Sequence, residues 1–137
     1  MIGVVIVAHA PLASSLMSCA SHVFGELQGV VVYDADSDRD PKLLQQELHD
    51  SVARADSGEG VLVLADVAGA TPYNQAEKVV REEGQDGRAV TMLAGVNLPM
   101  LLRTLPYRHL PLDELAQRAL TGGTQGVLRA DCSSHQN

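Results

Sequence analysis

His9 is the residue of this chain whose position most strongly suggests chemistry. It follows the run Val-Val-Ile-Val-Ala at 4–8, which is typical of a buried strand. Pro11 comes shortly afterwards, and proline favours the first turn of a helix. His9 is therefore expected where a parallel strand meets a helix N-terminus, and this edge of an α/β sheet binds ligands and anions. A neutral imidazole there can take up a phosphoryl group. From position alone, a polar residue that only ends the strand is an equal alternative.

Asp66 is the natural chemical partner of His9. It follows the run Val-Leu-Val-Leu-Ala at 61–65, which predicts another buried strand. A carboxylate that accepts a hydrogen bond from one ring N–H fixes the histidine tautomer. It also stabilises the positive charge that the ring gains on phosphorylation, as the carboxylate of a catalytic triad does. The alternative interpretation of Asp66 is an ordinary loop carboxylate.

The segment Gly69-Ala70-Thr71-Pro72 offers groups that can hold a phosphate without a metal. These are the backbone N–H groups of Gly69 and Ala70, the Thr71 hydroxyl and a helix N-terminus. Thr71 is also expected to be the N-cap of the helix that Pro72 begins, and the two roles are compatible.

Hydrophobic periodicity predicts alternating strands and helices, which position these side chains. Gly122 and Gly123 are expected to end the last helix. The buried face of the first helix is expected to hold Leu12, Leu16, Cys19 or Ala20, and Val23. Strands are predicted over 4–8, 29–33, 61–65, 88–94 and 127–129, and helices over 11–24, 41–55, 71–80, 98–105 and 112–120.

The alternation predicts an α/β fold with a mostly parallel, doubly wound sheet and helices on both faces. Right-handed crossovers favour the strand order 2-1-3-4. In that order the direction of winding switches between the first and third strands, so His9 and Asp66 become neighbours at the switch point.

Length and composition predict one domain over residues 1–130, followed by a polar tail at 131–137 that we expect to be disordered. The core should be aliphatic, because 45% of the residues are hydrophobic and only 3% are aromatic. A net charge of −7 argues against nucleic-acid binding, which needs clustered Lys and Arg. No apolar run suits a signal peptide or a membrane span, so we expect a cytoplasmic protein.

No cofactor, metal site or disulfide is predicted. Cys19 and Cys132 are far apart, and the histidines lack the spacing of metal ligands. The aspartate-rich loop 34–40 lacks the glycine of a calcium-binding loop, so we interpret it as a solvated turn in which Asp40 caps the next helix.

Three segments carry a family resemblance. They are Val-Val-Ile-Val-Ala-His at 4–9, Asp-Val-Ala-Gly-Ala-Thr-Pro-Tyr-Asn at 66–74 and Ala-Gly-Val-Asn-Leu-Pro-Met-Leu at 94–101. Together they resemble enzyme IIA (EIIA) of the mannose family of the bacterial phosphoenolpyruvate:sugar phosphotransferase system, over nearly the whole chain to about Ala130. This chain has Ala10 and Ala70 where the family usually has glycine, and each extra methyl group disfavours a positive φ.

The resemblance implies a phosphocarrier that needs no cofactor. His9 would accept a phosphoryl group from phospho-HPr through Nε2 and pass it to an enzyme IIB, in sugar uptake or in a regulatory branch. Asp66 would hold Nδ1, and Gly69, Ala70 and Thr71 would bind the phosphate. A nearby loop of four residues would help to dock partners, or would cap and start a short helix, namely Asn97, Leu98, Pro99 and Met100.

The resemblance also implies a homodimer in which an antiparallel C-terminal edge strand, here 127–129, is exchanged between subunits. The membrane would be contacted only through a separate IIC and IID permease. One alternative is the phosphotransfer subunit of a dihydroxyacetone kinase, although Thr-Pro-Tyr-Asn at 71–74 looks more like the sugar family. A small tetrapyrrole chelatase and a non-catalytic dimeric binding module are further alternatives.

Overall fold

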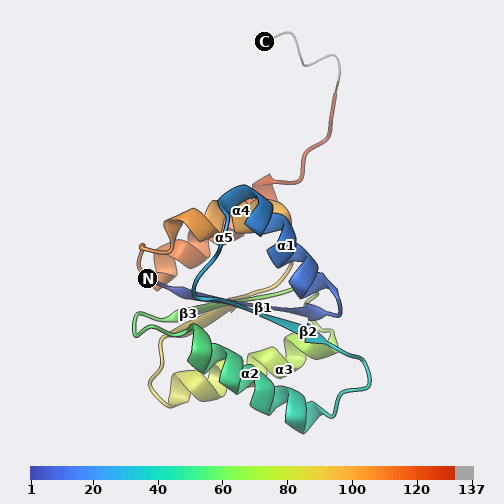
Figure 1. Ribbon diagram of the computed structural model, residues 1–137, viewed down its shortest axis with the longest axis vertical. Coiled ribbons are helices and arrows are strands. Elements are labelled where there is room, and N and C mark those ends of the chain that lie inside the picture. Colours follow the sequence, from blue (N-terminus) through green and yellow to red (C-terminus); the bar gives the residue numbers. More distant parts are fainter. Residues whose placement is uncertain (132–137) are drawn as a thin grey trace.

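Four parallel strands form the centre of the molecule, in the order β2-β1-β3-β4 (Figure 1). The computed structural model describes residues 1–131. The predicted strand order is confirmed, and all three strand pairs are parallel. The strands are β1 (Gly3–His9), β2 (Val30–Ala35), β3 (Val61–Ala65) and β4 (Val90–Leu93).

Helices cover both faces of this sheet, as predicted (Figure 1). One face packs against α1 (Leu12–Phe24), α4 (Leu98–Thr104) and α5 (Leu112–Gln125), with the short 3₁₀ helix η1 (Leu105–Tyr107) after α4. The other face packs against α2 (Pro41–Ala55) and α3 (Thr71–Gln85). Among residues 1–131, no helix is both long and apolar enough to cross a membrane.

Side chains of β1 alternate between two aliphatic cores. Val4 and Ile6 lie in the core under α1, α4 and α5, whereas Val5 and Val7 lie in the core under α2 and α3. All four are fully buried. The strand is therefore apolar along its whole length because both of its faces are covered.

The buried face of α1 differs from the prediction. Ala13, Leu16 and Ala20 are buried, whereas Leu12 is 40% exposed and Val23 is 63% exposed. Both sets of residues have the spacing of one helix face, so periodicity alone does not choose between them. Packing on the sheet selects the set with the smaller side chains.

The predicted end of the last helix at Gly122 and Gly123 is wrong, because α5 continues to Gln125. Both glycines are buried against α4. A Cβ atom at position 122 would lie 2.6 Å from Cβ of Arg103, and one at position 123 would lie 2.8 Å from Cε of Met100. These glycines allow two helices to approach closely, so tertiary packing overrides their tendency to end a helix.

The predicted C-terminal antiparallel strand is not seen, because residues 127–129 form no strand in the described part of the chain. Val127 and Leu128 are 78% and 85% exposed. After α5 the chain runs away from the sheet (Figure 1), so this segment meets no strand with which to pair. The remainder of the predicted tail, residues 132–137 with Cys132, lies outside the described residues.

Candidate functional site

His9 and Asp66 are in contact at the carboxyl ends of β1 and β3. Nδ1 of His9 lies 2.7 Å from Oδ2 of Asp66, and the backbone N–H of His9 donates to the same oxygen at 2.9 Å. The backbone N–H of Val67 donates to Oδ1 of Asp66 at 2.8 Å. The carboxylate is thus fixed by three contacts, two of them from His9 itself.

The surroundings of Asp66 keep it ionised. Asp66 is only 8% exposed. Burial alone would raise the pKa of Asp66, but hydrogen bonds from the His9 amide, the His9 ring and the Val67 amide outweigh it and hold the pKa below its ordinary value. An ionised carboxylate only accepts hydrogen bonds, so Nδ1 of His9 must carry the proton.

The other ring nitrogen of His9, Nε2, therefore carries no proton. The tautomer with a proton on Nδ1 leaves the lone pair on Nε2. Nε2 makes no hydrogen bond with any of residues 1–131, and the His9 side chain is 52% exposed. This nitrogen is open to a reagent that approaches from solvent.

The loop after β3 turns sharply at Gly69, which has a φ of +88°. Only glycine adopts this conformation without strain. Ala70 has a φ of −78°, and every described residue with a positive φ is a glycine. The methyl groups of Ala10 and Ala70 therefore cause no backbone strain. Asn74 stabilises the loop, because its side-chain amide donates to the Gly69 carbonyl at 3.1 Å.

Thr71 is the first residue of α3, and the residue at the N-cap position is Ala70. The prediction that Thr71 caps this helix is therefore wrong. Within the described chain, its hydroxyl makes no hydrogen bond, so it is available to a ligand. The N–H of Ala70 instead donates to the Val67 carbonyl at 3.2 Å.

Thr71 and His9 line the same small cavity, which has a volume of about 90 Å³. Asp36 and Ser37 from the loop after β2 also line it, and sequence reasoning missed both. The signal was available, because β2 pairs with β1 and His9 is in register with Ala35. Residues that follow Ala35 must therefore lie beside His9. The other lining residues are Ala35, Leu44 and Pro72.

Asp34 anchors the helix that begins beside His9. Pro11 occupies the N-cap position of α1 and provides no side-chain cap. The carboxylate of Asp34 takes over this role, because it accepts from the Ser14 amide at 3.0 Å and also from the Ser14 hydroxyl. Asp34 is thus a capping residue rather than part of a solvated turn. Asp40 caps α2 as predicted, accepting from the Lys42 amide at 3.1 Å.

The loop before α4 is attached to the end of β3. The N–H of Gly95 donates to the Asp66 carbonyl at 2.7 Å, and that of Val96 donates to the Ala65 carbonyl at 3.0 Å. These bonds hold the backbone of Asp66 in place. They also bring the segment 94–97 to the same edge of the sheet as His9.

The four residues of the predicted docking loop have different surroundings. Asn97 caps α4, since its side chain accepts from the Met100 amide at 2.9 Å and donates to the Gly123 carbonyl at 3.2 Å. Met100 is only 2% exposed, and Pro99 lies against Gly126. Leu98 is 37% exposed. Of the four, Leu98 has the most apolar surface available for a partner.

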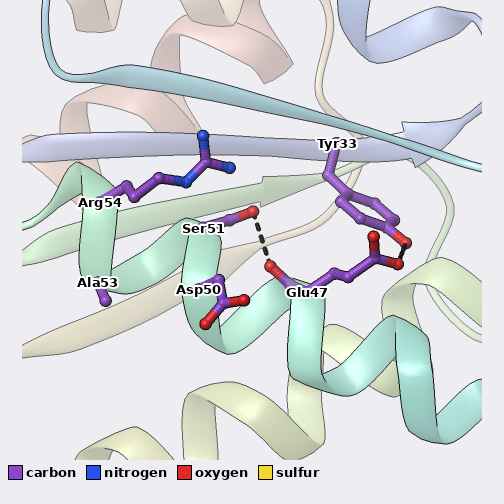
Figure 2. A pocket seen from close by; sticks show the side chains of 6 residues that line it. All are labelled: Tyr33, Glu47, Asp50, Ser51, Ala53 and Arg54. Atoms are coloured by element: carbon purple, nitrogen blue, oxygen red, sulfur yellow. Dashed lines mark hydrogen bonds between the residues drawn. The ribbon is translucent and has the colours of Figure 1, made fainter.

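A larger cavity of about 420 Å³ lies along α2 and the outer strand β2 (Figure 2), and His9 is not among its lining residues. Tyr33 donates its hydroxyl to Glu47 at 2.9 Å. Burial and this contact with a carboxylate raise the pKa of Tyr33 above its ordinary value. No histidine or cysteine is among the described residues that line this cavity. Its lining residues are Tyr33, Glu47, Asp50, Ser51, Ala53 and Arg54.

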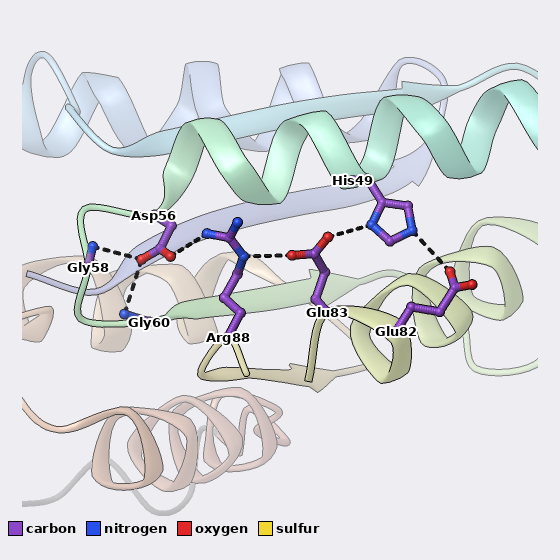
Figure 3. A network of polar contacts seen from close by, with 7 residues as sticks. All are labelled: His49, Asp56, Gly58, Gly60, Glu82, Glu83 and Arg88. Atoms are coloured by element: carbon purple, nitrogen blue, oxygen red, sulfur yellow. Dashed lines mark hydrogen bonds and ion pairs between the residues drawn. The ribbon is translucent and has the colours of Figure 1, made fainter. Parts of the chain in front are cut away.

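A polar network joins α2 to α3 (Figure 3). His49 lies between two carboxylates, with Nδ1 at 2.5 Å from Glu83 and Nε2 at 3.0 Å from Glu82. Arg88 bridges Glu83 and Asp56. Burial alone would lower the pKa of His49, but the two glutamates outweigh it and raise the pKa above its ordinary value. This network is structural, because it ties the helices together.

Residues 1–131 contain no group of three or more His, Cys, Asp or Glu side chains that could hold a metal ion. The chelatase alternative requires such a group of converging ligands.

Comparison with known proteins agrees with the fold. A sequence model of the family EIIA-man, described as PTS system fructose IIA component, matches residues 3–119. The PTS system fructose-specific EIIA component of Bacillus subtilis is 33% identical over 136 residues, which are 98% of this chain and 89% of that protein.

The PTS system mannose-specific EIIAB component of Escherichia coli K12 is 33% identical over 128 residues, or 92% of this chain. The match spans only 38% of that longer protein. Among solved structures, EIIA from Streptococcus agalactiae superposes with a TM-score of 0.85 at 24% identity, over 94% of this chain and 97% of that one. The mannose/sorbose-specific IIA subunit from Enterococcus faecalis superposes with a TM-score of 0.81 at 23% identity, over 95% of each chain. This chain belongs to the EIIA-man family of phosphotransferase-system IIA components.

Proposed function

We propose that this IIA component carries its phosphoryl group on Nε2 of His9, taking it from phospho-HPr and passing it to an enzyme IIB. This phosphoryl transfer contributes to sugar uptake or to a regulatory branch of the same system. The observation that carries the proposal is the contact of 2.7 Å between Nδ1 of His9 and the buried carboxylate of Asp66. This contact selects the tautomer in which Nε2 is the nucleophile.

The transfer needs no reactant besides His9 and the phosphorylated donor. The Nε2 lone pair attacks phosphorus, and an N–P bond forms as the N–P bond of the donor phosphohistidine breaks. The electron pair of the broken bond returns to the donor nitrogen. The Nδ1 proton stays on His9 and continues to donate to Asp66, whose negative charge stabilises the positive phosphoimidazole ring. Passing the group to IIB repeats these steps in the opposite direction.

Phosphoryl transfer depends mainly on in-line positioning and on stabilising the equatorial oxygens. The Thr71 hydroxyl and the Thr71 backbone N–H at the start of α3 are suited to the second task, because Thr71 lines the same cavity as His9. We also place Gly69 and Ala70 in this phosphate site, because they form the loop that leads to Thr71. No metal or cofactor is part of the proposal.

Partner docking is supported by apolar side chains at the His9 edge of the sheet. Leu12 is 40% exposed, Val67 is 57% exposed and Leu98 is 37% exposed, and each lies on a segment that follows β1, β3 or β4. Side chains of this kind favour the desolvated centre of a protein interface. The net charge of −7 favours a partner with a basic surface.

We further propose a homodimer in which residues 127–129 pair with the edge strand β4 of a second copy. The support is the exposure of Val127 and Leu128, at 78% and 85%, and the open edge of β4 in the sheet order. Light scattering should find a dimer for the whole chain and for a variant without residues 132–137, but a monomer for one without residues 127–137. A dimer of the shortest variant would contradict this pairing.

We propose a cytoplasmic location, because the protein must meet HPr and IIB there. Contact with the membrane would be made only through a separate IIC and IID permease.

The proposed function is tested by incubating the chain with phosphoenolpyruvate, enzyme I and HPr and measuring intact mass. We expect an acid-labile gain of one phosphate, which is lost in His9→Ala. His22→Ala is the matched control, because His22 is an exposed histidine on α1, and it should still be phosphorylated. No gain under conditions in which HPr is itself phosphorylated would refute the proposal.

A further inference from the structure

The cavity beside His9 has a wall that the site described above does not use. Thr71 and Pro72, at the start of α3, form one side of it. Asp36 and Ser37, in the loop between β2 and α2, also line it. A group attached to Nε2 would therefore have the α3 terminus and this loop as its neighbours.

The position of the loop is fixed by the sheet. His9 is in register with Ala35 in the parallel pair β1–β2, and the Ala10 amide donates to the Ala35 carbonyl at 3.0 Å. Residues in register on parallel strands point to the same face. Ala35 belongs to the core under α2 and α3, so the His9 ring lies on that face, where Ser37 follows.

The hydroxyl of Ser37 is available to a stronger acceptor. Its hydrogen bond is a contact of 3.5 Å with Oδ1 of Asp38, which is at the long limit for such a bond. Among the described residues that line the cavity there is no Lys or Arg. Neutral donors must therefore stabilise an anion here, and Ser37 and Thr71 carry the hydroxyl groups of the lining.

The size of the cavity suits a phosphoryl group. Its volume of about 90 Å³ exceeds the roughly 10–15 Å³ that a cavity needs to hold one water molecule, so it can hold a few oxygen-sized groups. The three outer oxygens of a phosphoryl group are of this number and size. The carboxylate of Asp36, which also lines the cavity, repels the same group. Hydroxyl donors in the cavity would offset this repulsion and so stabilise the phosphorylated form of the protein.

We propose that Ser37 is a second phosphate-binding residue, donating its hydroxyl to a phosphoryl oxygen on His9 alongside Thr71. This inference rests on the proposed function, since it requires the phosphoryl group on Nε2. It assigns a binding role to the loop after β2.

The test measures the equilibrium constant for phosphoryl exchange between phospho-HPr and the chain, in the wild type and in three variants. Ser37→Ala should lower this constant about tenfold, the lower end of the range for a hydrogen bond to a charged group. Ser37→Thr keeps a hydroxyl and should remain close to the wild type. Ser18→Ala, at an exposed serine of α1, should match the wild type.

An equilibrium constant for Ser37→Ala equal to that of Ser18→Ala would overturn the inference while leaving the proposed function intact. A wild type that is not phosphorylated would overturn both. A second measurement is independent of any variant: in the NMR spectrum of the whole chain, phosphorylation should shift the backbone amide signal of Ser37 as well as that of Thr71. An unmoved Ser37 signal beside a shifted Thr71 signal would also overturn the assignment.

Discussion

Replacing Asp66 by asparagine should nearly abolish phosphorylation of His9 while changing the shape of the site very little. Asparagine keeps one oxygen acceptor and replaces the other by an amide donor. If its oxygen takes the place of Oδ2, it can still accept from the His9 ring and backbone N–H, but its NH₂ group then faces the Val67 N–H, and the neutral side chain no longer stabilises a positive ring. If the amide nitrogen faces the ring, Nδ1 must accept, and the ring proton moves to Nε2. In that tautomer Nε2 has no lone pair to attack phosphorus.

The magnitude follows from the contacts that the carboxylate makes. The bond of 2.7 Å from Nδ1 is charge-assisted once the ring becomes positive, and such a bond contributes about 1.5–3 kcal/mol. That range corresponds to a rate loss of about 10- to 150-fold. The unfavourable tautomer adds to this loss, so we expect a decrease of at least about 100-fold. Stability should fall by about 1–3 kcal/mol, because a buried donor loses its acceptor.

The assay is a single-turnover quench measurement of phosphoryl transfer from purified phospho-HPr, with urea denaturation of each variant. Asp50→Asn is the matched control, since Asp50 is an exposed aspartate of α2. The control should transfer at the wild-type rate. A folded Asp66→Asn variant that also transfers at a rate of the wild-type order would refute the tautomer argument.

Other perturbations act on stability. Gly122→Ala should lower the free energy of unfolding by about 1–3 kcal/mol in urea denaturation, because the new Cβ would lie 2.6 Å from Cβ of Arg103. Gly84→Ala is its control, since no atom lies within 4 Å of a Cβ there, and it should gain about 0.5–1 kcal/mol; equal effects of the two changes would contradict the packing argument. The raised pKa of His49 means that its stabilising contribution is complete below the unfolded pKa and is lost as pH rises through the folded pKa. Thermal unfolding of His49→Gln should therefore lack this decrease as pH rises above the ordinary histidine pKa, and a decrease identical to the wild type would rule out His49 as its source. The lowered pKa of Asp66 has the opposite effect on stability. Its contribution to the free energy of unfolding is present above the ordinary aspartate pKa and is lost as pH falls through the folded value. Comparing the stability of Asp66→Asn with that of the wild type during an acid titration would reveal this loss.

The contact between His9 and Asp66 follows from the sequence because it depends on two strong signals. Each residue ends a continuous apolar run, and the strand order makes the two runs neighbours. Parallel strands bring their carboxyl ends to one edge, so no detailed side-chain packing was needed. The same logic applied to β2 would have placed Ser37 at the site.

Other features depend on packing that periodicity does not contain. The apolar residues of α1 fit two helix faces equally well, and contact with the sheet decides between them. Gly122 has a strong local tendency to end a helix, yet the close approach of α4 keeps it inside α5. The cap of α1 comes from Asp34, which is distant in sequence and therefore invisible to a local capping rule.

The C-terminal segment shows a different reason why a predicted strand is not seen. Residues 127–129 have the composition of a strand, but a strand exists only when another strand accepts its hydrogen bonds. The described chain offers them none, and the proposed partner is a second copy.

The central claim is that His9 carries the phosphoryl group on Nε2 because Asp66 holds the Nδ1 proton. The most direct test is ¹⁵N NMR of the histidine-labelled chain before and after phosphorylation by HPr. We expect the His9 ring to carry its proton on Nδ1 before the reaction, and phosphorus to be bonded to Nε2 afterwards while the Nδ1 proton remains. Phosphorus on Nδ1, or on another histidine, would contradict it.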